Sequence, residues 1–239
     1  MDIAGSVALV TGGNRGIGRT FVEELQRRGA AKVYAAVRRP DAVRIPGATV
    51  LPLDITRPDS VAAVAEAAPD VTLLVNNAGI SSSTSLIAGD LATIRLEMET
   101  HYFGTLSVIR AFAPVLAANG GGTLLNILSA AAWINVPTGY AASKAAMWSA
   151  TNALRVELRG QGTQVIGLLV GMVDTPMSER WTVPKVSPAS VVAQAYDGVA
   201  EGALEVLADE PTRDLKSRLN TRGEELYPWL DEVLGSFVA

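Results

Sequence analysis

The sequence contains no cysteine and only one histidine, His101. The absence of cysteine excludes disulfide bonds and thiol nucleophiles, and a single histidine leaves no zinc site built from these two residue types. A catalytic triad of the serine-protease type would need His101 as its base. Charged residues make up only 18% of the 239 residues and hydrophobic residues 49%, a balance that is typical of a folded globular protein.

The sequence also lacks a long hydrophobic run and an excess of basic residues. Its longest apolar run, residues 165–173, is much shorter than the ~20 residues that cross a bilayer. The first five residues do not resemble a secretory signal. The net charge of −4 offers no general attraction to nucleic acid or to anionic membranes. We therefore expect a cytoplasmic protein that binds neither nucleic acid nor membranes.

What is present is a regular alternation of short apolar runs with longer helical segments. The apolar runs predict buried strands at residues 7–10, 32–37, 49–53, 72–75, 123–128 and 164–170. The segments between them predict helices at residues 17–28, 60–67, 91–118 and 140–159, followed by a helix near 188–201, a strand near 204–207 and a helical tail. This alternation predicts an α/β fold with a doubly wound parallel sheet and helices on both faces. No linker or repeat divides the chain, so we expect a single domain over residues 1–239 with an insert at residues 176–190.

A glycine-rich turn at residues 11–18 follows the first predicted strand and opens the first predicted helix. Glycine lets the backbone turn tightly and approach a phosphate, and the start of a helix favours negative charge. Such turns also occur for structural reasons alone, but the position in a strand–turn–helix unit favours phosphate binding. The residues of this turn that we assign to cofactor binding are Gly12, Asn14, Arg15, Gly16, Ile17 and Gly18.

The second predicted strand is followed by Arg38 and not by an acidic residue. An Asp or Glu at this place would accept hydrogen bonds from the adenosine ribose of NAD. Arg38 and Arg15 together can instead bind a 2′-phosphate, with roughly 1.5–3 kcal/mol for each charge-assisted bond. Both arginines would also be unremarkable as solvated surface residues, but their convergence favours NADP(H) over NAD(H).

Tyr140 and Lys144 lie four residues apart at the start of a predicted helix, so they share one helix face. A free tyrosine titrates near 10, and a neighbouring ammonium lowers its pKa; a value near 7 requires roughly 4 kcal/mol. Ser129 ends the preceding strand and can hold a substrate oxygen through its hydroxyl. A Tyr and Lys pair is often only a surface pair, but its place in the strand order favours acid–base chemistry.

These motifs, in this order, resemble those of the short-chain dehydrogenase/reductase family along nearly the whole chain. The matching residues are the turn at 11–18, Asp54, residues 76–79, Ser129, residues 140–144 and residues 171–175. The resemblance implies a Rossmann-like fold and hydride transfer between a nicotinamide and a carbonyl/alcohol pair. It implies that Tyr140 is the general acid/base, that Lys144 lowers its pKa and holds the nicotinamide ribose, and that Ser129 orients the substrate. The further cofactor contacts that it implies, besides Tyr140 and Lys144, are Asp54, Ile55, Asn77, Ala78, Gly79, Val173 and Thr175.

The sequence departs from the family pattern at His101, where the family usually has an asparagine that supports a water in a proton relay. Imidazole accepts and donates protons near neutral pH, so we expect His101 to serve this relay as a catalytic residue. The alternative is a helix histidine with satisfied hydrogen bonds and no part in the relay. A second departure is Val170-Gly171 in place of Pro-Gly, which leaves the backbone less restricted.

The remaining residues indicate an apolar substrate and self-association. Trp133 and Trp181 fall where the family binds substrate and favour an apolar carbonyl or alcohol. The helices at 91–118 and 140–159 are apolar on more than one face, which favours a homodimer or homotetramer unless both faces are buried within one subunit. The leading hypothesis is an NADP-dependent carbonyl reductase. The alternatives are an epimerase or dehydratase with a tightly held cofactor, and a cofactor-sensing regulatory protein with little or no turnover.

Overall fold

The computed structural model describes residues 1–134 and 136–238, and its strands form one seven-stranded parallel sheet. The strand order is β3-β2-β1-β4-β5-β6-β7. The chain adds strands toward one edge of the sheet from β1 to β3 and toward the other edge from β4 to β7. The strands are β1 (Val7–Thr11), β2 (Lys32–Val37), β3 (Thr49–Pro52), β4 (Leu73–Asn76), β5 (Thr123–Ile127), β6 (Gln164–Leu169) and β7 (Glu205–Leu207). This is the α/β, doubly wound arrangement that the alternating pattern predicts.

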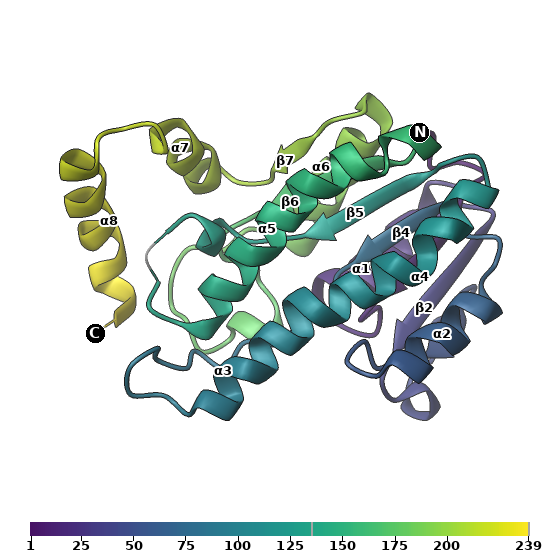
Figure 1. The fold of residues 1–239 in the computed structure, drawn as a ribbon, viewed down its shortest axis with the longest axis horizontal. Coiled ribbons are helices and arrows are strands. Elements are labelled where there is room, and N and C mark those ends of the chain that lie inside the picture. The colour runs from purple at the N-terminus through teal and green to yellow at the C-terminus, as the bar shows by residue number, and fades with distance from the viewer. Residues whose placement is uncertain (135, 239) are drawn as a thin grey trace.

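Most of the helices connect one strand to the next and lie on both sides of the sheet, and α7 and α8 follow the last strand (Figure 1). They are α1 (Gly16–Arg27), α2 (Pro58–Ala67), α3 (Leu91–Met98), α4 (Thr105–Ala118), α5 (Gly139–Glu157), α6 (Pro188–Glu201), α7 (Glu210–Arg218) and α8 (Gly223–Val238). The single helix predicted at residues 91–118 is wrong in one respect, because a π-helical segment, Glu99–Gly104, separates α3 from α4. None of the described helices has the length and apolar character needed to cross a bilayer.

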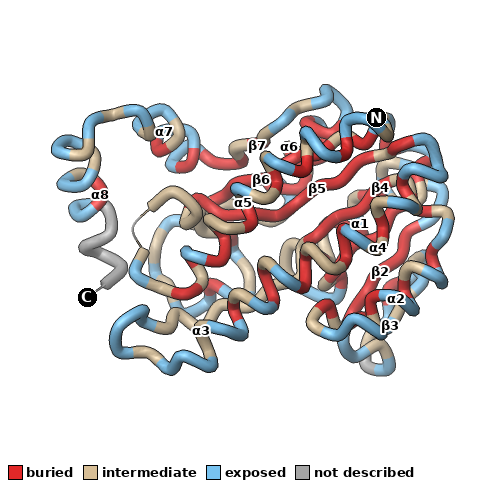
Figure 2. The backbone as a smooth tube through the Cα atoms, viewed as in Figure 1, coloured by how far each residue is buried: buried red, intermediate tan, exposed pale blue. Residues whose placement is uncertain are grey.

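Two apolar layers hold the helices against the sheet. Side chains of α1 and α6 fill the layer on one face, and side chains of α2, α4 and α5 fill the layer on the other. Tyr196 of α6 packs edge-on against Phe21 of α1, with ring centroids 5.3 Å apart, and its hydroxyl donates to the Phe21 carbonyl at 3.0 Å. The five inner strands are therefore buried along most of their length, whereas the edge strand β3 and the outer helix faces are more exposed (Figure 2).

Helices α7 and α8 form an arm that follows β7 and lies beside the loop after β5 (Figure 1). Leu230 of α8 is buried in a small cluster that also contains Ala130 of that loop. Lys216 of α7 pairs with Glu205 at 2.7 Å and lies 4.6 Å from the ring centre of Trp133. The arm is thus attached to the segment that immediately follows Ser129.

Candidate active site

The glycine-rich turn connects β1 to the amino end of α1. Gly12 and Gly16 have φ angles of 68° and 54°, a region that other residues rarely adopt. A Cβ on Gly18 would lie 2.2 Å from the Gly12 carbonyl oxygen. The close packing of the turn and its position at a helix amino end fit a pyrophosphate group.

Asn77 fastens this turn to the end of β4. Its side-chain amide donates to the carbonyl oxygens of Thr11 at 2.9 Å and Gly12 at 3.3 Å. The Thr11 hydroxyl accepts hydrogen bonds from the backbone N–H groups of Asn77 and Ala78, both at 3.0 Å. These bonds join β1 and β4 where the strand order reverses, which is the place where doubly wound sheets bind dinucleotides.

Two exposed arginines lie beside the glycine turn and the end of β2. Neither Arg15 nor Arg38 has an ion-pair partner within the parts of the chain that the structure describes. Hydrogen bonds from Thr56 hold the pKa of Asp54 below its ordinary value, and the charge of Arg38 lowers this pKa further. Arg38 is therefore close to the carboxyl end of β3, and Ile55 is buried next to Asp54. Arg38 follows β2, and Asp54 and Ile55 follow β3, so these residues lie at the same carboxyl edge of the sheet as the glycine-rich turn after β1.

Ser129, Tyr140 and Lys144 come together at the carboxyl end of β5. Ser129 lies just after β5, and its side chain accepts a hydrogen bond from the Ala131 N–H at 3.2 Å. Tyr140 is the second residue of α5, and Lys144 lies one turn further along the same helix. The Lys144 ammonium is 5.7 Å from the Tyr140 ring centre and donates to the Ile127 carbonyl at 2.8 Å.

Burial dominates the ionisation of both titratable groups in this cluster. Burial raises the pKa of Tyr140. A hydrogen bond with Ser129 lowers this pKa, and the negative charge of Glu97 raises it. Burial also lowers the pKa of Lys144 to about 8. The lowering of the Tyr140 pKa by Lys144 and a bound nicotinamide cation stays a prediction, and burial of the phenol opposes it.

His101 lies in the π-helical segment with both ring nitrogens occupied. Its Nε2 accepts a hydrogen bond from the Ile80 N–H at 3.1 Å, so Nδ1 carries the proton and donates to the Ser143 hydroxyl at 2.8 Å. That hydroxyl donates to the Tyr140 carbonyl at 2.7 Å. Burial, with the charge of Lys144, lowers the pKa of His101 to about 2. Of the two interpretations that the sequence left open, this geometry supports the histidine with satisfied hydrogen bonds.

Sequence reasoning missed Glu97, a buried carboxylate close to Tyr140. A glutamate on a surface helix is normally solvated, so composition gives no reason to select it. A signal was nevertheless present, because Glu97 lies four residues before His101 and therefore on the same helix face.

In the segment between β6 and α6, Val173 forms a parallel bridge with Val186. The bridge brings the two ends of the loop at residues 173–186 together, and α6 begins two residues later at Pro188. Thr175 lies at the start of this segment, with its hydroxyl donating to the Val173 carbonyl at 3.4 Å. The Arg180 side chain donates to the Ser83 hydroxyl and so connects the segment to the loop after β4.

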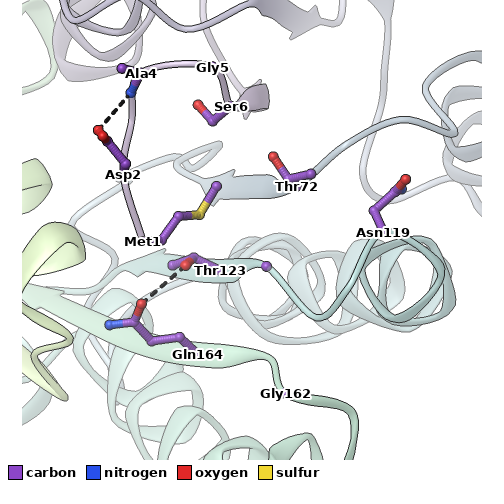
Figure 3. Close-up of a pocket in the computed structure, with 11 residues that line it drawn as sticks. Met1, Asp2, Ala4, Gly5, Ser6, Thr72, Asn119, Thr123, Gly162 and Gln164 are labelled. Carbon is purple, nitrogen blue, oxygen red and sulfur yellow. Dashed lines mark hydrogen bonds between the residues drawn. The ribbon is translucent and has the colours of Figure 1, made fainter.

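A separate hollow of about 460 Å³ lies at the opposite edge of the sheet, beside the amino ends of the strands (Figure 3). The residues that line it include Met1, Asp2, Ser6, Thr72, Asn119, Thr123 and Gln164. None of the residues assigned to catalysis or cofactor binding belongs to its lining. The candidate active site is therefore the carboxyl edge, where those residues gather.

Comparison with known proteins identifies similar chains. The model of the short chain dehydrogenase family matches residues 6–185. A short chain dehydrogenase from Burkholderia cenocepacia, solved in complex with NADP, is 37% identical with a TM-score of 0.92, and the match covers 96% of this chain and 99% of that one. The 1-deoxy-11-beta-hydroxypentalenate dehydrogenase of Streptomyces exfoliatus is 33% identical over 215 residues, which are 82% of this chain and 78% of the relative. A short chain dehydrogenase/reductase from Burkholderia phymatum, solved in complex with NAD, has a TM-score of 0.81 and 23% identity over 96% of both chains, a likeness of fold alone.

Proposed function

The chain belongs to the short-chain dehydrogenase family, and on this basis we propose that it reduces an apolar carbonyl compound to an alcohol with NADPH. The grouping of Ser129, Tyr140 and Lys144 beside the glycine-rich turn is the observation that carries this proposal. A hydroxyl, a phenol and an ammonium in one cluster supply a hydrogen bond, a proton and a positive charge to a substrate oxygen.

When bound, the reduced nicotinamide supplies the hydride to the carbonyl carbon. Ser129 donates a hydrogen bond to the carbonyl oxygen, and Tyr140 transfers its phenolic proton to the same oxygen. Lys144 holds the ribose hydroxyls and stabilises the phenolate that remains after the proton transfer. In the reverse direction, the Tyr140 phenolate accepts the proton of the alcohol.

Several groups of residues would hold the dinucleotide. The glycine-rich turn binds the pyrophosphate, and the residues after β3, β4 and β6 bind the adenosine and the carboxamide. The residues proposed for these contacts, besides Tyr140 and Lys144, are Gly12, Asn14, Arg15, Gly16, Ile17, Gly18, Arg38, Asp54, Ile55, Asn77, Ala78, Gly79, Val173 and Thr175.

We propose NADP(H) and not NAD(H) as the cofactor. Arg15 and Arg38 are exposed and have no ion-pair partner among the described residues, so both remain available to a 2′-phosphate. The structure of the Burkholderia cenocepacia relative in complex with NADP supports the same choice.

The proposed substrate is apolar because aromatic and aliphatic residues gather at the segment that follows Ser129. Trp133 and Ile134 pack with Leu226 and Trp229 of the arm, and Trp181 lies in the segment between β6 and α6, within the proposed substrate insert at residues 176–190. The Streptomyces exfoliatus relative, a dehydrogenase of a hydroxylated pentalenate, supports alcohol and carbonyl chemistry.

We further propose that the protein is a cytoplasmic homodimer or homotetramer, folded as one domain over residues 1–239. Phe103 of the π-helical segment and Val156 of α5 are large apolar side chains that are 52% and 67% exposed. Contact between copies would cover them. Light scattering after size-exclusion chromatography tests this; a monomer at micromolar concentration would contradict it.

Turnover in the Tyr140→Phe variant separates the enzyme from the cofactor-sensing alternative. Wild-type protein and variant are each given NADPH and a panel of apolar ketones and aldehydes, and nicotinamide absorbance is followed. We expect the variant to bind NADPH normally and to lose turnover by about a hundredfold or more, the usual worth of a general acid. Normal NADPH binding without turnover of any carbonyl by the wild-type protein would favour the sensor.

A further inference from the structure

Glu97 of α3 is a fully buried carboxylate with only one of its oxygens satisfied. Its Oε1 accepts hydrogen bonds from the Ser82 N–H at 2.9 Å and from the Ser82 hydroxyl at 2.7 Å. Its Oε2 is buried without a hydrogen-bond partner, and no cation forms an ion pair with it within the described residues. Burying a charge in this way is costly, so its location needs a physical explanation.

The unsatisfied oxygen faces the start of the helix that carries Tyr140. A Cβ built on Gly139, the first residue of α5, would lie only 2.6 Å from Glu97 Oε2. The amino end of a helix carries a partial positive charge, which stabilises a carboxylate there. Glu97 therefore lies against the first turn of α5, which carries Tyr140, and its Coulomb interaction acts on the phenol.

Four groups face Tyr140 from the elements packed around it. Lys144 lies on the same helix, His101 lies edge-on to the phenol ring at 5.2 Å, Ser129 hydrogen bonds to the phenol, and Glu97 approaches from α3. His101 is neutral because its Nε2 accepts a backbone hydrogen bond. Lys144 therefore contributes the positive charge and Glu97 the negative charge, and Glu97 favours the protonated phenol.

We propose that Glu97 is a positioning residue whose buried negative charge keeps the Tyr140 phenol protonated and so extends the pH range of carbonyl reduction upward. This inference rests on the proposed function, in which reduction needs the phenol and oxidation needs the phenolate. In reduction the Tyr140 O–H bond breaks, the proton goes to the substrate oxygen, and the electron pair stays on the phenolate. The Coulomb effect of Glu97 raises the pKa of Tyr140, in agreement with this role.

The test is a Glu97→Gln substitution, which removes the charge and keeps an oxygen that accepts the hydrogen bonds of Ser82. Ionisation of Tyr140 is followed by tyrosinate absorbance, as the difference from the same protein carrying Tyr140→Phe. The pH dependence of kcat/KM is measured in both reaction directions. We expect Tyr140 to ionise about one pH unit lower in Glu97→Gln. The apparent pKa of the kcat/KM profile is expected to fall by the same amount in each reaction direction. Glu97→Met has a similar volume and no charge, and it is expected to give the same shift. It replaces Glu97→Gln as the test variant if the amide of glutamine disturbs the packing.

Two variants separate charge from structure. Glu99→Gln makes the same substitution on an exposed side chain two residues away and is expected to leave Tyr140 unchanged. Ser82→Ala removes the hydroxyl hydrogen bond to Glu97 but keeps the backbone hydrogen bond and the charge of Glu97, so it is expected not to lower the pKa of Tyr140. An unchanged Tyr140 titration in both Glu97 variants, or an equal shift in Ser82→Ala, would overturn the inference. A lowered Tyr140 titration without turnover of any carbonyl would instead contradict the proposed function.

Discussion

Lys144 shows how a single residue combines a cost in stability with a function. The residue is only 8% exposed, its ammonium donates to the Ile127 carbonyl, and burial lowers its pKa from 10.5 to about 8. Because this folded-state pKa lies below the unfolded one, the folded protein binds fewer protons between these two values. Stability contributed by Lys144 therefore increases as the pH rises from about 8 to about 10.5, and below this window the buried charge is destabilising.

We predict that Lys144→Met is inactive but more stable than the wild-type protein at neutral pH. Removing the buried ammonium raises the free energy of unfolding by about 1–2 kcal/mol, after the loss of the Ile127 hydrogen bond. The difference between the two proteins should shrink as the pH rises through the window above. Urea unfolding at a series of pH values measures it, and a difference that stays constant with pH would contradict the buried charge.

For His101 we predict no effect on the pH dependence of catalysis. Both ring nitrogens are engaged and burial lowers its pKa to about 2, so the ring keeps one charge state during turnover. His101→Asn should retain kcat/KM within about tenfold and keep the same profile from about pH 5 to pH 9, since an amide can also bond to Ile80 and Ser143. A shifted limb in the pH–rate profile of His101→Asn would restore the relay interpretation.

The site residues differ in how far sequence reveals them. Spacing alone places Tyr140 and Lys144 on one helix face, and the structure places Ser129 beside them. The ionisation of these groups was not predictable, because it depends on burial by segments distant in sequence. Glu97 was missed for the same reason: its burial against Gly139 arises only when α3 packs on α5.

At the scale of elements, the contact between α3 and α5 depends on Gly139. A methyl group there would meet Glu97 Oε2 at 2.6 Å and the Ile94 Cα at 3.3 Å, so the helices would have to separate. We predict that Gly139→Ala lowers the free energy of unfolding by about 1–2 kcal/mol despite the better helix propensity of alanine, and lowers kcat about tenfold by displacing Tyr140. Gly160→Ala is the matched control, because nothing lies within 4 Å of its added Cβ. Equal stability and turnover of the two variants would contradict this view of the contact.

Most elements follow from local pattern, and one does not. Buried parallel strands are continuous apolar runs, so all six strands predicted up to residue 170 are found, with no end shifted by more than one residue. The π-helical segment Glu99–Gly104 has no comparable signature in the sequence. It inserts one residue into the turn that carries His101, and such insertions are frequent at functional sites.

At the scale of the whole molecule, the arm formed by α7 and α8 links the end of the chain to the substrate side of the sheet. Leu230 is 1% exposed against Ala130, which directly follows Ser129. We predict that Leu230→Ala releases α8 and raises KM for an apolar carbonyl by about three- to tenfold, while the affinity for NADPH is unchanged.

Limited proteolysis after residue 222 and steady-state kinetics measure the two effects. Tyr227→Ala, at a position that is 55% exposed on the same helix, serves as the control and should change neither. A Leu230→Ala protein whose α8 is readily cleaved but whose KM is unchanged would show that the arm does not border the substrate.

The whole account depends on NADP binding at the carboxyl edge of the sheet, and a side-by-side titration with NADPH and NADH tests this most directly. Nicotinamide fluorescence follows binding to the wild-type protein and to Arg38→Ala. The account predicts that NADPH binds the wild-type protein about tenfold or more tightly than NADH, and that Arg38→Ala loses most of this preference. Equal binding of the two cofactors would contradict the roles of Arg15 and Arg38, and binding of neither would contradict the account as a whole.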